Sequence, residues 1–175
     1  TLLGALCFNE CEALERVRLS DNITTILNST FYWCTSLREL NIPSKLEVVD
    51  CYAFCACAAL PDITLPDGLK SIDEYAFMSC YEFTEIDIPK GVTLMGQNCF
   101  GDCPKLERVS LPESLQELGA NAFFGCPLLR EVNIPESITE LSAGLFQGCE
   151  SLESVVLPPR LKIVGDFAFD GCTSL

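Results

Sequence analysis

Residues 106–126 read LERVSLPESLQELGANAFFGC, and this stretch decides the fold because it recurs along the whole chain. Its phenylalanine returns every 23 residues, as Phe8, Phe31, Phe54, Phe77, Phe100, Phe123, Phe146 and Phe169. A cysteine follows three residues after each of them, as Cys11, Cys34, Cys57, Cys80, Cys103, Cys126, Cys149 and Cys172. No insertion or deletion breaks this register, so the 175 residues form one internally repeated array.

The repeated unit reads L-x-x-V-x-L-P-x-x-L-x-x-I-x-x-x-A-F-x-x-C-x-x. Its first part alternates apolar and polar residues at its end, which predicts a short half-buried strand that stops where proline cannot donate a hydrogen bond. The next two apolar positions predict a second short extended or turn segment, and A-F-x-x-C predicts one 3₁₀ or loose turn. A single coil cannot bury its apolar side, so stacked coils must share a core.

The unit resembles that of the leucine-rich repeat superfamily and, more narrowly, its Treponema/BspA-type class, whose repeat also ends in A-F-x-x-C. The resemblance covers the whole chain and implies a repeat solenoid, a right-handed superhelix with a parallel β-sheet on its concave face. Short strands and turns or 3₁₀ segments would form the convex side. We therefore expect residues 1–175 to be one array of about 7.5 coils. Both ends stop within a repeat without a polar cap, so we expect a segment of a longer array.

Composition and charge argue against several function classes. The net charge of −14 disfavours nucleic acid and anionic membranes as partners and favours a basic protein. No apolar run is long enough to span a membrane. The absence of histidine and of phosphate-binding glycine loops predicts that the chain is not an enzyme and needs no cofactor.

The twelve cysteines are interpreted through the register of eight of them. A metal column and a disulfide series are the functional alternatives, but every other in-register position is apolar. Cysteine serves as a small hydrophobe in cores, and thiols that face one way along a ladder cannot converge tetrahedrally on zinc. We predict free thiols packed in the core and no metal site.

A partner-binding surface is predicted on the exposed positions of the first strand, the expected concave face. The candidate residues are Arg38, Glu39, Asp62, Glu85, Asp87 and Arg108. Most charges alternate in sign between coils, which suits a solvated ladder, but Glu39, Asp62 and Glu85 form a row of like charges that costs stability. This row favours a site for a basic partner or a cation such as calcium, with chance clustering in an acidic chain as the alternative.

A second candidate surface is aromatic and lies at the turn edge. Its residues are Tyr32, Trp33, Met78 and Tyr81. Exposed aromatic side chains anchor protein contacts, and packing over the neighbouring coil is the alternative. Two N-x-S/T sequons, at Asn22 and Asn28, would accept glycans if the protein is secreted by a eukaryote.

The fold resemblance and these surfaces predict a non-catalytic module for protein binding and cell adhesion. The alternative is a structural spacer or filament segment that self-associates by stacking its uncapped ends. The resemblance implies a place on the cell surface or outside the cell, and an intracellular location remains open.

Overall fold

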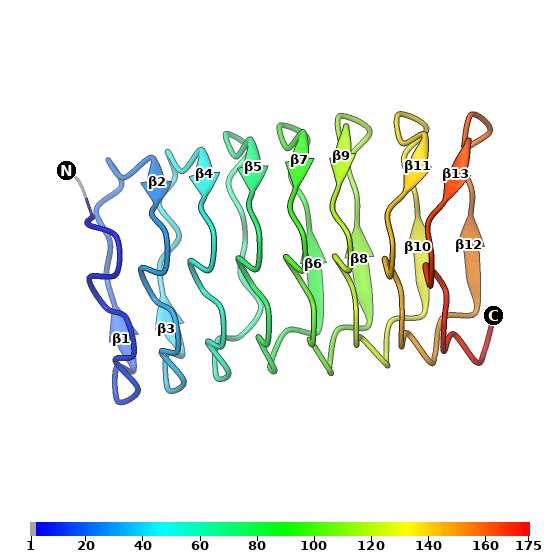
Figure 1. The fold of residues 1–175 in the computed structure, drawn as a ribbon. Helices are drawn as coiled ribbons and strands as arrows, with labels where there is room; N and C mark the ends of the chain where they lie inside the picture. The colour runs from blue at the N-terminus through cyan, green and yellow to red at the C-terminus, as the bar shows by residue number, and fades with distance from the viewer. Residues whose placement is uncertain (1–2) are drawn as a thin grey trace.

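The computed structural model describes residues 3–175 and shows a solenoid in which the coils stack side by side from the N-terminus to the C-terminus (Figure 1). The described residues contain thirteen short strands and no helix, and therefore no helix suited to crossing a membrane. Every strand pair is parallel, because each coil travels in the same direction as the coil before it. The predicted repeat solenoid with parallel sheets is therefore confirmed.

The strands form two columns, one on each side of the core (Figure 1). The first column comes from L-x-x-V-x-L and holds β1 (Arg16–Val17), β3 (Glu39–Leu40), β6 (Glu85–Asp87), β8 (Arg108–Ser110), β10 (Glu131–Asn133) and β12 (Ser154–Val156). The second column holds β2 (Thr25–Ile26), β4 (Val48–Val49), β5 (Ser71–Ile72), β7 (Leu94–Met95), β9 (Glu117–Leu118), β11 (Glu140–Leu141) and β13 (Ile163–Val164). The second segment, for which the spacing allowed a strand or a turn, is thus a strand.

The first column is interrupted between β3 and β6, where residues 61–64 form no strand. Pro61 has no backbone N–H to donate to the preceding coil, so the ladder cannot continue through this position. On the side of the next coil, the Asp62 carboxylate accepts hydrogen bonds from the backbone N–H groups of Thr84 and Glu85 at 2.7 and 3.2 Å.

The core is a stack of identical side chains. The eight phenylalanine rings lie nearly parallel, with neighbouring centroids 5.2–6.0 Å apart. From Cys34 onward, each ladder cysteine donates its thiol hydrogen to the carbonyl of the phenylalanine in the coil before, at 3.1–3.4 Å. The ladder cysteines therefore pack as predicted, and their weak donor adds a second hydrogen bond to a carbonyl that in most coils also accepts a backbone N–H within its own turn, as Phe31 does from Cys34 at 3.2 Å.

The A-F-x-x-C segment forms turns instead of a 3₁₀ helix, since two residues in each coil adopt the left-handed conformation. They lie two positions before and two positions after each phenylalanine, with φ between 51° and 77°. Except in the last coil, each donates its backbone N–H to a carbonyl of the next coil, as Trp33 does to Cys55 at 2.8 Å. Positive φ thus points the backbone N–H toward the next coil. In a 3₁₀ helix this N–H would instead bond to a carbonyl of its own coil.

Candidate functional site

The outward face of the first column carries the charges predicted to form a partner surface, and most of them pair with one another. Glu39 lies 3.1 Å from Arg16. Arg108 contacts both Glu85 and Asp87 at 2.9 Å. These ion pairs run between adjacent coils and are mostly exposed, so each stabilises the stack by about 1 kcal/mol or less.

Two members of the row of like charges, Glu39 and Glu85, are therefore paired with arginines, whereas Asp62 makes no salt bridge among the described residues. The Asp62 carboxylate accepts hydrogen bonds from backbone N–H groups of the next coil and, at 2.6 Å, from the Thr84 hydroxyl. Of the two predicted arginines, Arg38 has no carboxylate partner among the described residues; its Nε lies 3.5 Å from the Ser36 carbonyl. The interruption at Pro61 leaves a hollow of about 890 Å³ beside Arg38, in which three arginines face three carboxylates.

Only two of the four predicted aromatic-edge residues, Tyr32 and Trp33, contact each other, and two further tyrosines join them. Tyr32 contacts Trp33 with a ring separation of 5.9 Å and Tyr52 edge-on at 6.2 Å. Tyr52 then stacks on Tyr75 at 4.7 Å, and Gln97 donates a hydrogen bond to the Tyr75 hydroxyl at 3.0 Å. Tyr32, Trp33, Tyr52 and Tyr75 form a continuous aromatic strip across three coils.

The other two predicted aromatic-edge residues lie apart from this strip. Met78 is half-buried and occupies the coil position of Tyr32 two coils further on. Tyr81 is 47% exposed and makes no ring contact among residues 3–175. The sequence predicts that Tyr52 stacks on Tyr75, one coil apart, as side packing, and this stacking is confirmed. It misses the contact between Tyr32 and Tyr52, which joins that pair to the predicted edge.

Three members of the aromatic strip have positive φ, namely Trp33 at 60°, Tyr52 at 57° and Tyr75 at 58°. A bulky L-residue in this conformation costs about 1–2 kcal/mol because its Cβ approaches a backbone carbonyl. Trp33 is nevertheless 45% exposed, so burial offsets only part of this cost. The left-handed position recurs in every coil, so the strain belongs to the turn. What marks Trp33 as a candidate contact site is a large aromatic side chain that stays exposed beside three tyrosines.

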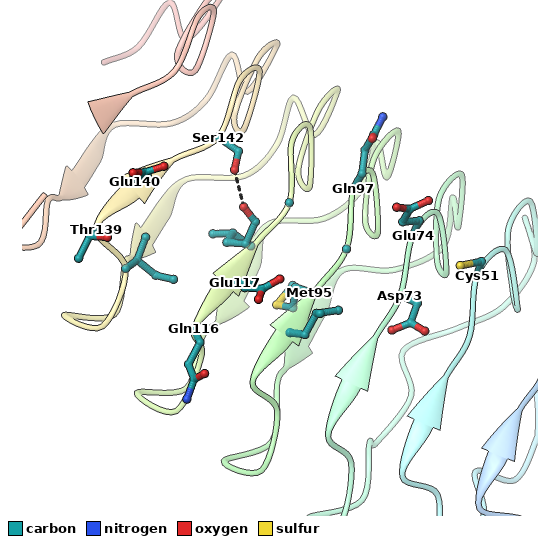
Figure 2. A pocket seen from close by; sticks show the side chains of 15 residues that line it. Cys51, Asp73, Glu74, Met95, Gln97, Gln116, Glu117, Thr139, Glu140 and Ser142 are labelled. Atoms are coloured by element: carbon teal, nitrogen blue, oxygen red, sulfur yellow. Dashed lines mark hydrogen bonds between the residues drawn. The ribbon is translucent and has the colours of Figure 1, made fainter. Parts of the chain in front are cut away.

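A groove of about 730 Å³ lies over β7, β9 and β11 of the second column and over Asp73 and Glu74, which follow β5 (Figure 2). Gly96 and Gly119 occupy the coil position that holds Asp73 in the coil before them and Ser142 in the coil after them. The hollow therefore extends over two coils that have no side chain at this position. Four carboxylates line it, from Asp73, Glu74, Glu117 and Glu140, and no basic residue does.

Asp50, Cys51 and Asp73 lie at one end of this groove and could bring three ligand atoms within 4.8 Å of one another. Both Asp50 oxygens already accept backbone hydrogen bonds, from Asn28 at 3.1 Å and from Cys51 at 2.7 Å. Burial, followed by the nearby carboxylates, raises the pKa of the Cys51 thiol. A thiol that stays protonated is a poor metal ligand, so this cluster does not point to a metal.

The thiols of the core offer no activated nucleophile. Burial raises the pKa of Cys55 to about 11 and that of Cys103 and Cys149 to about 12. Catalytic cysteines need the opposite shift, supplied by cationic or helix-terminal surroundings. The two sequon asparagines, Asn22 and Asn28, are both exposed, and Asn22 accepts a hydrogen bond from Lys45 at 3.0 Å.

The chain is similar to known bacterial repeat proteins. The family model described as the BspA type leucine-rich repeat region, in 6 copies, matches residues 1–129 and residues 47–175. No curated protein matches the chain.

Among solved structures, a leucine-rich repeat protein from Bacteroides ovatus ATCC 8483 is 34% identical, with a TM-score of 0.89 over 96% of this chain. The chain spans 44% of that protein's length. The T. pallidum leucine-rich repeat protein is also 34% identical, with a TM-score of 0.87 over 91% of this chain and 77% of its own.

A leucine-rich cell surface protein from Faecalibacterium prausnitzii A2-165 shares the fold, with 24% identity and a TM-score of 0.67 over 97% of this chain and 60% of its own. Together, the repeat register, the stacked phenylalanines and the two matched regions show that the chain belongs to the BspA-type leucine-rich repeat family.

Proposed function

We propose that this chain is a non-catalytic protein-binding module that serves in adhesion, at the cell surface or outside the cell. The leucine-rich repeat is a scaffold typically used in protein interaction. The observation that carries the proposal is the aromatic strip, which keeps Trp33 exposed at a conformational cost. Large aromatic side chains are enriched among the few residues that dominate the binding energy of protein interfaces, so an exposed tryptophan beside three tyrosines offers an anchor for a partner.

The outward face of the first column is the second contact surface in this proposal. It includes Arg38, Glu39, Asp62, Glu85, Asp87 and Arg108. Its paired charges would set the register of a partner and the rate of encounter more than the affinity. The net charge of −14 favours a basic partner.

The test replaces the strained aromatic residues with those that the same coil positions hold elsewhere in the chain. The triple variant Trp33→Gly, Tyr52→Asn and Tyr75→Asn keeps the left-handed turns because glycine and asparagine adopt them readily. Immobilised wild type and variant are exposed to surface proteins of candidate host cells, and captured proteins are compared by quantitative cross-linking and mass spectrometry.

We expect the variant to remain folded by circular dichroism and to lose a defined set of captured proteins. The matched control, Ser79→Gly, changes a non-aromatic left-handed residue and should leave that set intact. An identical set of captured proteins for wild type and the triple variant would refute the role of the aromatic strip.

A structural spacer that assembles end to end is the second candidate. Each coil stacks on the next through parallel backbone hydrogen bonds and a shared column of phenylalanine rings, and a second copy of the array could continue this stacking. Light scattering over a range of concentrations tests this candidate, since a strict monomer at high concentration would exclude it.

A further inference from the structure

The groove over the second column differs from the rest of the surface because its hollow is fixed by the backbone. A Cβ added at Gly96 would lie 2.5 Å from the Glu74 nitrogen and 2.6 Å from the Asp73 carbonyl carbon. A Cβ at Gly119 would lie 2.5 Å from the Gly96 carbonyl carbon. Neither position can carry a side chain while the coils keep this path, so the hollow is a built feature of the stack.

The charge around the hollow has no internal counterion. In the preceding coils, Lys70 lies 2.8 Å from Glu47 and neutralises it. The coil position of Lys70 is then held by Thr93, Gln116 and Thr139. None of the four groove carboxylates makes a salt bridge within the described chain.

The floor and rim of the groove differ in chemistry. The floor is formed by the backbone of Gly96 and Gly119 and by half-buried Leu94. Met95, Leu118 and Ile138 lie beneath it with their side chains in the core. The carboxylates of Glu74, Glu117 and Glu140 stand at its exposed rim (Figure 2). An apolar floor with an acidic rim complements an amphipathic, positively charged ligand.

The dimensions suit a short extended chain. Glu117 and Glu140 occupy the same position in successive coils, and Asp73 belongs to a coil two steps before Glu117. Neighbouring parallel strands lie about 4.8 Å apart, so the rim extends over about 14 Å, or four to five residues of extended polypeptide.

We infer that this groove binds an extended segment of a protein partner that alternates lysine or arginine with apolar residues. The basic side chains pair with the carboxylates of the rim, and the apolar side chains lie on the glycine floor. The inference shares the proposed protein-binding function but uses neither the aromatic strip nor the first column.

The probe is a fluorescein-labelled lysine–valine hexapeptide of alternating sequence, with the matching glutamate–valine peptide as its reversed-charge control. Binding to the full chain is measured by fluorescence anisotropy at low and at physiological salt. We compare wild type with the variant Asp73→Asn, Glu74→Gln, Glu117→Gln and Glu140→Gln. The matched variant removes four exposed carboxylates outside the groove, by Glu12→Gln, Glu113→Gln, Glu136→Gln and Glu150→Gln.

We expect the groove variant to bind the lysine peptide at least about tenfold more weakly than wild type, because each exposed ion pair contributes modestly and four are lost. The matched variant should lose about twofold or less, since it changes only the net charge. In ¹⁵N-labelled protein, the peptide should shift the amide resonances of Gly96 and Gly119, whether or not a substituted chain folds well.

Equal losses in both carboxylate variants would show binding to the acidic surface as a whole and overturn the inference. The inference would also be overturned if the peptide binds without shifting the amide resonances of Gly96 and Gly119. Spermidine that shifts them equally and displaces the peptide would assign the groove to small polycations instead. The triple aromatic variant should bind the lysine peptide like wild type, so failure of the proposed aromatic contact is separable from failure of this inference.

Discussion

The two halves of the stack share one core but differ in their left-handed turn residues. The N-terminal coils place Leu6, Glu10, Ser29, Trp33, Tyr52, Ala56, Tyr75 and Ser79 at these positions. The C-terminal coils place Asn98, Asp102, Asn121, Gly125, Gly144, Gly148, Phe167 and Gly171 there. Glycine, asparagine and aspartate tolerate positive φ, so the C-terminal half satisfies the turn with little strain except at Phe167.

The turn therefore forms equally with small residues, and the fold does not require bulky side chains at these positions. The same hydrogen bonds to the next coil form in both halves, from Tyr52 to Glu74 at 2.9 Å and from Asn121 to Ala143 at 2.9 Å. The strain in the N-terminal half is therefore local to the turns, and the aromatic strip contains only Trp33, Tyr52 and Tyr75 of its eight left-handed residues. If the halves differ only at the turn, their cores should respond alike to substitution.

The largest effect should come from the core, where the halves ought to behave alike. Phe54 and Phe123 are both fully buried, so Phe54→Ala and Phe123→Ala should each destabilise the chain by about 3–5 kcal/mol. Chemical denaturation measures both free energies of unfolding. A difference of more than about 1.5 kcal/mol between them would show that the halves differ in their core packing as well.

A side chain at a glycine turn of the C-terminal half should be the next most costly change. Gly144 has a φ of 62°, and an added Cβ would collide with the Asn121 side chain. Gly144→Ala should therefore destabilise by about 1–2 kcal/mol or more. Gly68→Ala is the control, since its Cβ would lie 3.7 Å from the Leu46 carbonyl without positive φ. Equal destabilisation by both substitutions would argue against a conformational cause.

Relief of strain in the N-terminal half should have a smaller effect of opposite sign. Ser79 has a φ of 59° and belongs to no aromatic contact. Ser79→Gly removes a cost of about 1–2 kcal/mol, offset by about 0.5–1 kcal/mol of backbone entropy, so a net gain of about 0.5–1 kcal/mol is expected. The melting temperature measures this gain, and a decrease would show that the serine makes a contact that outweighs its strain.

The smallest effect concerns two carboxylates, one in each half. Burial raises the pKa of Asp102, and burial followed by the charges of Asp50 and Glu74 raises the pKa of Asp73. An acid with a raised folded pKa holds its proton more tightly when folded, so its contribution to stability grows as the pH falls from above that pKa toward about 3.9.

Asp73→Asn should consequently stabilise the chain at neutral pH and lose this advantage in acid. Added salt should shrink the advantage because it screens Asp50 and Glu74. Asp102→Asn should show a pH dependence that salt leaves nearly unchanged, since burial alone raises that pKa. Unfolding curves at several pH values and two salt concentrations give both comparisons; an equal salt response would contradict the assigned causes.

The sequence predicted those features that depend on side-chain period. Every in-register phenylalanine from Phe31 to Phe146 is fully buried, and the strands of the first column begin where L-x-x-V-x-L predicts them. The same reasoning could not find the break at residues 61–64, although Pro61 is the signal that marks it. It also singled out Glu39, Asp62 and Glu85 as a row of like charges, whereas the arginines that flank the row at the same coil position, Arg16 and Arg108, pair with Glu39 and Glu85.

By itself, the sequence determined the repeat length, the parallel stacking and the identity of the core, because burial depends on which residues recur at a fixed period. Only the tertiary structure decided which backbone residues take positive φ, which aromatic rings meet, and where two glycines leave a hollow. These features arise from the approach of one coil to the next. The 23-residue repeat shows that Gly96 and Gly119 occupy the same coil position. The close approach of the preceding coil's backbone shows that no side chain larger than hydrogen fits there.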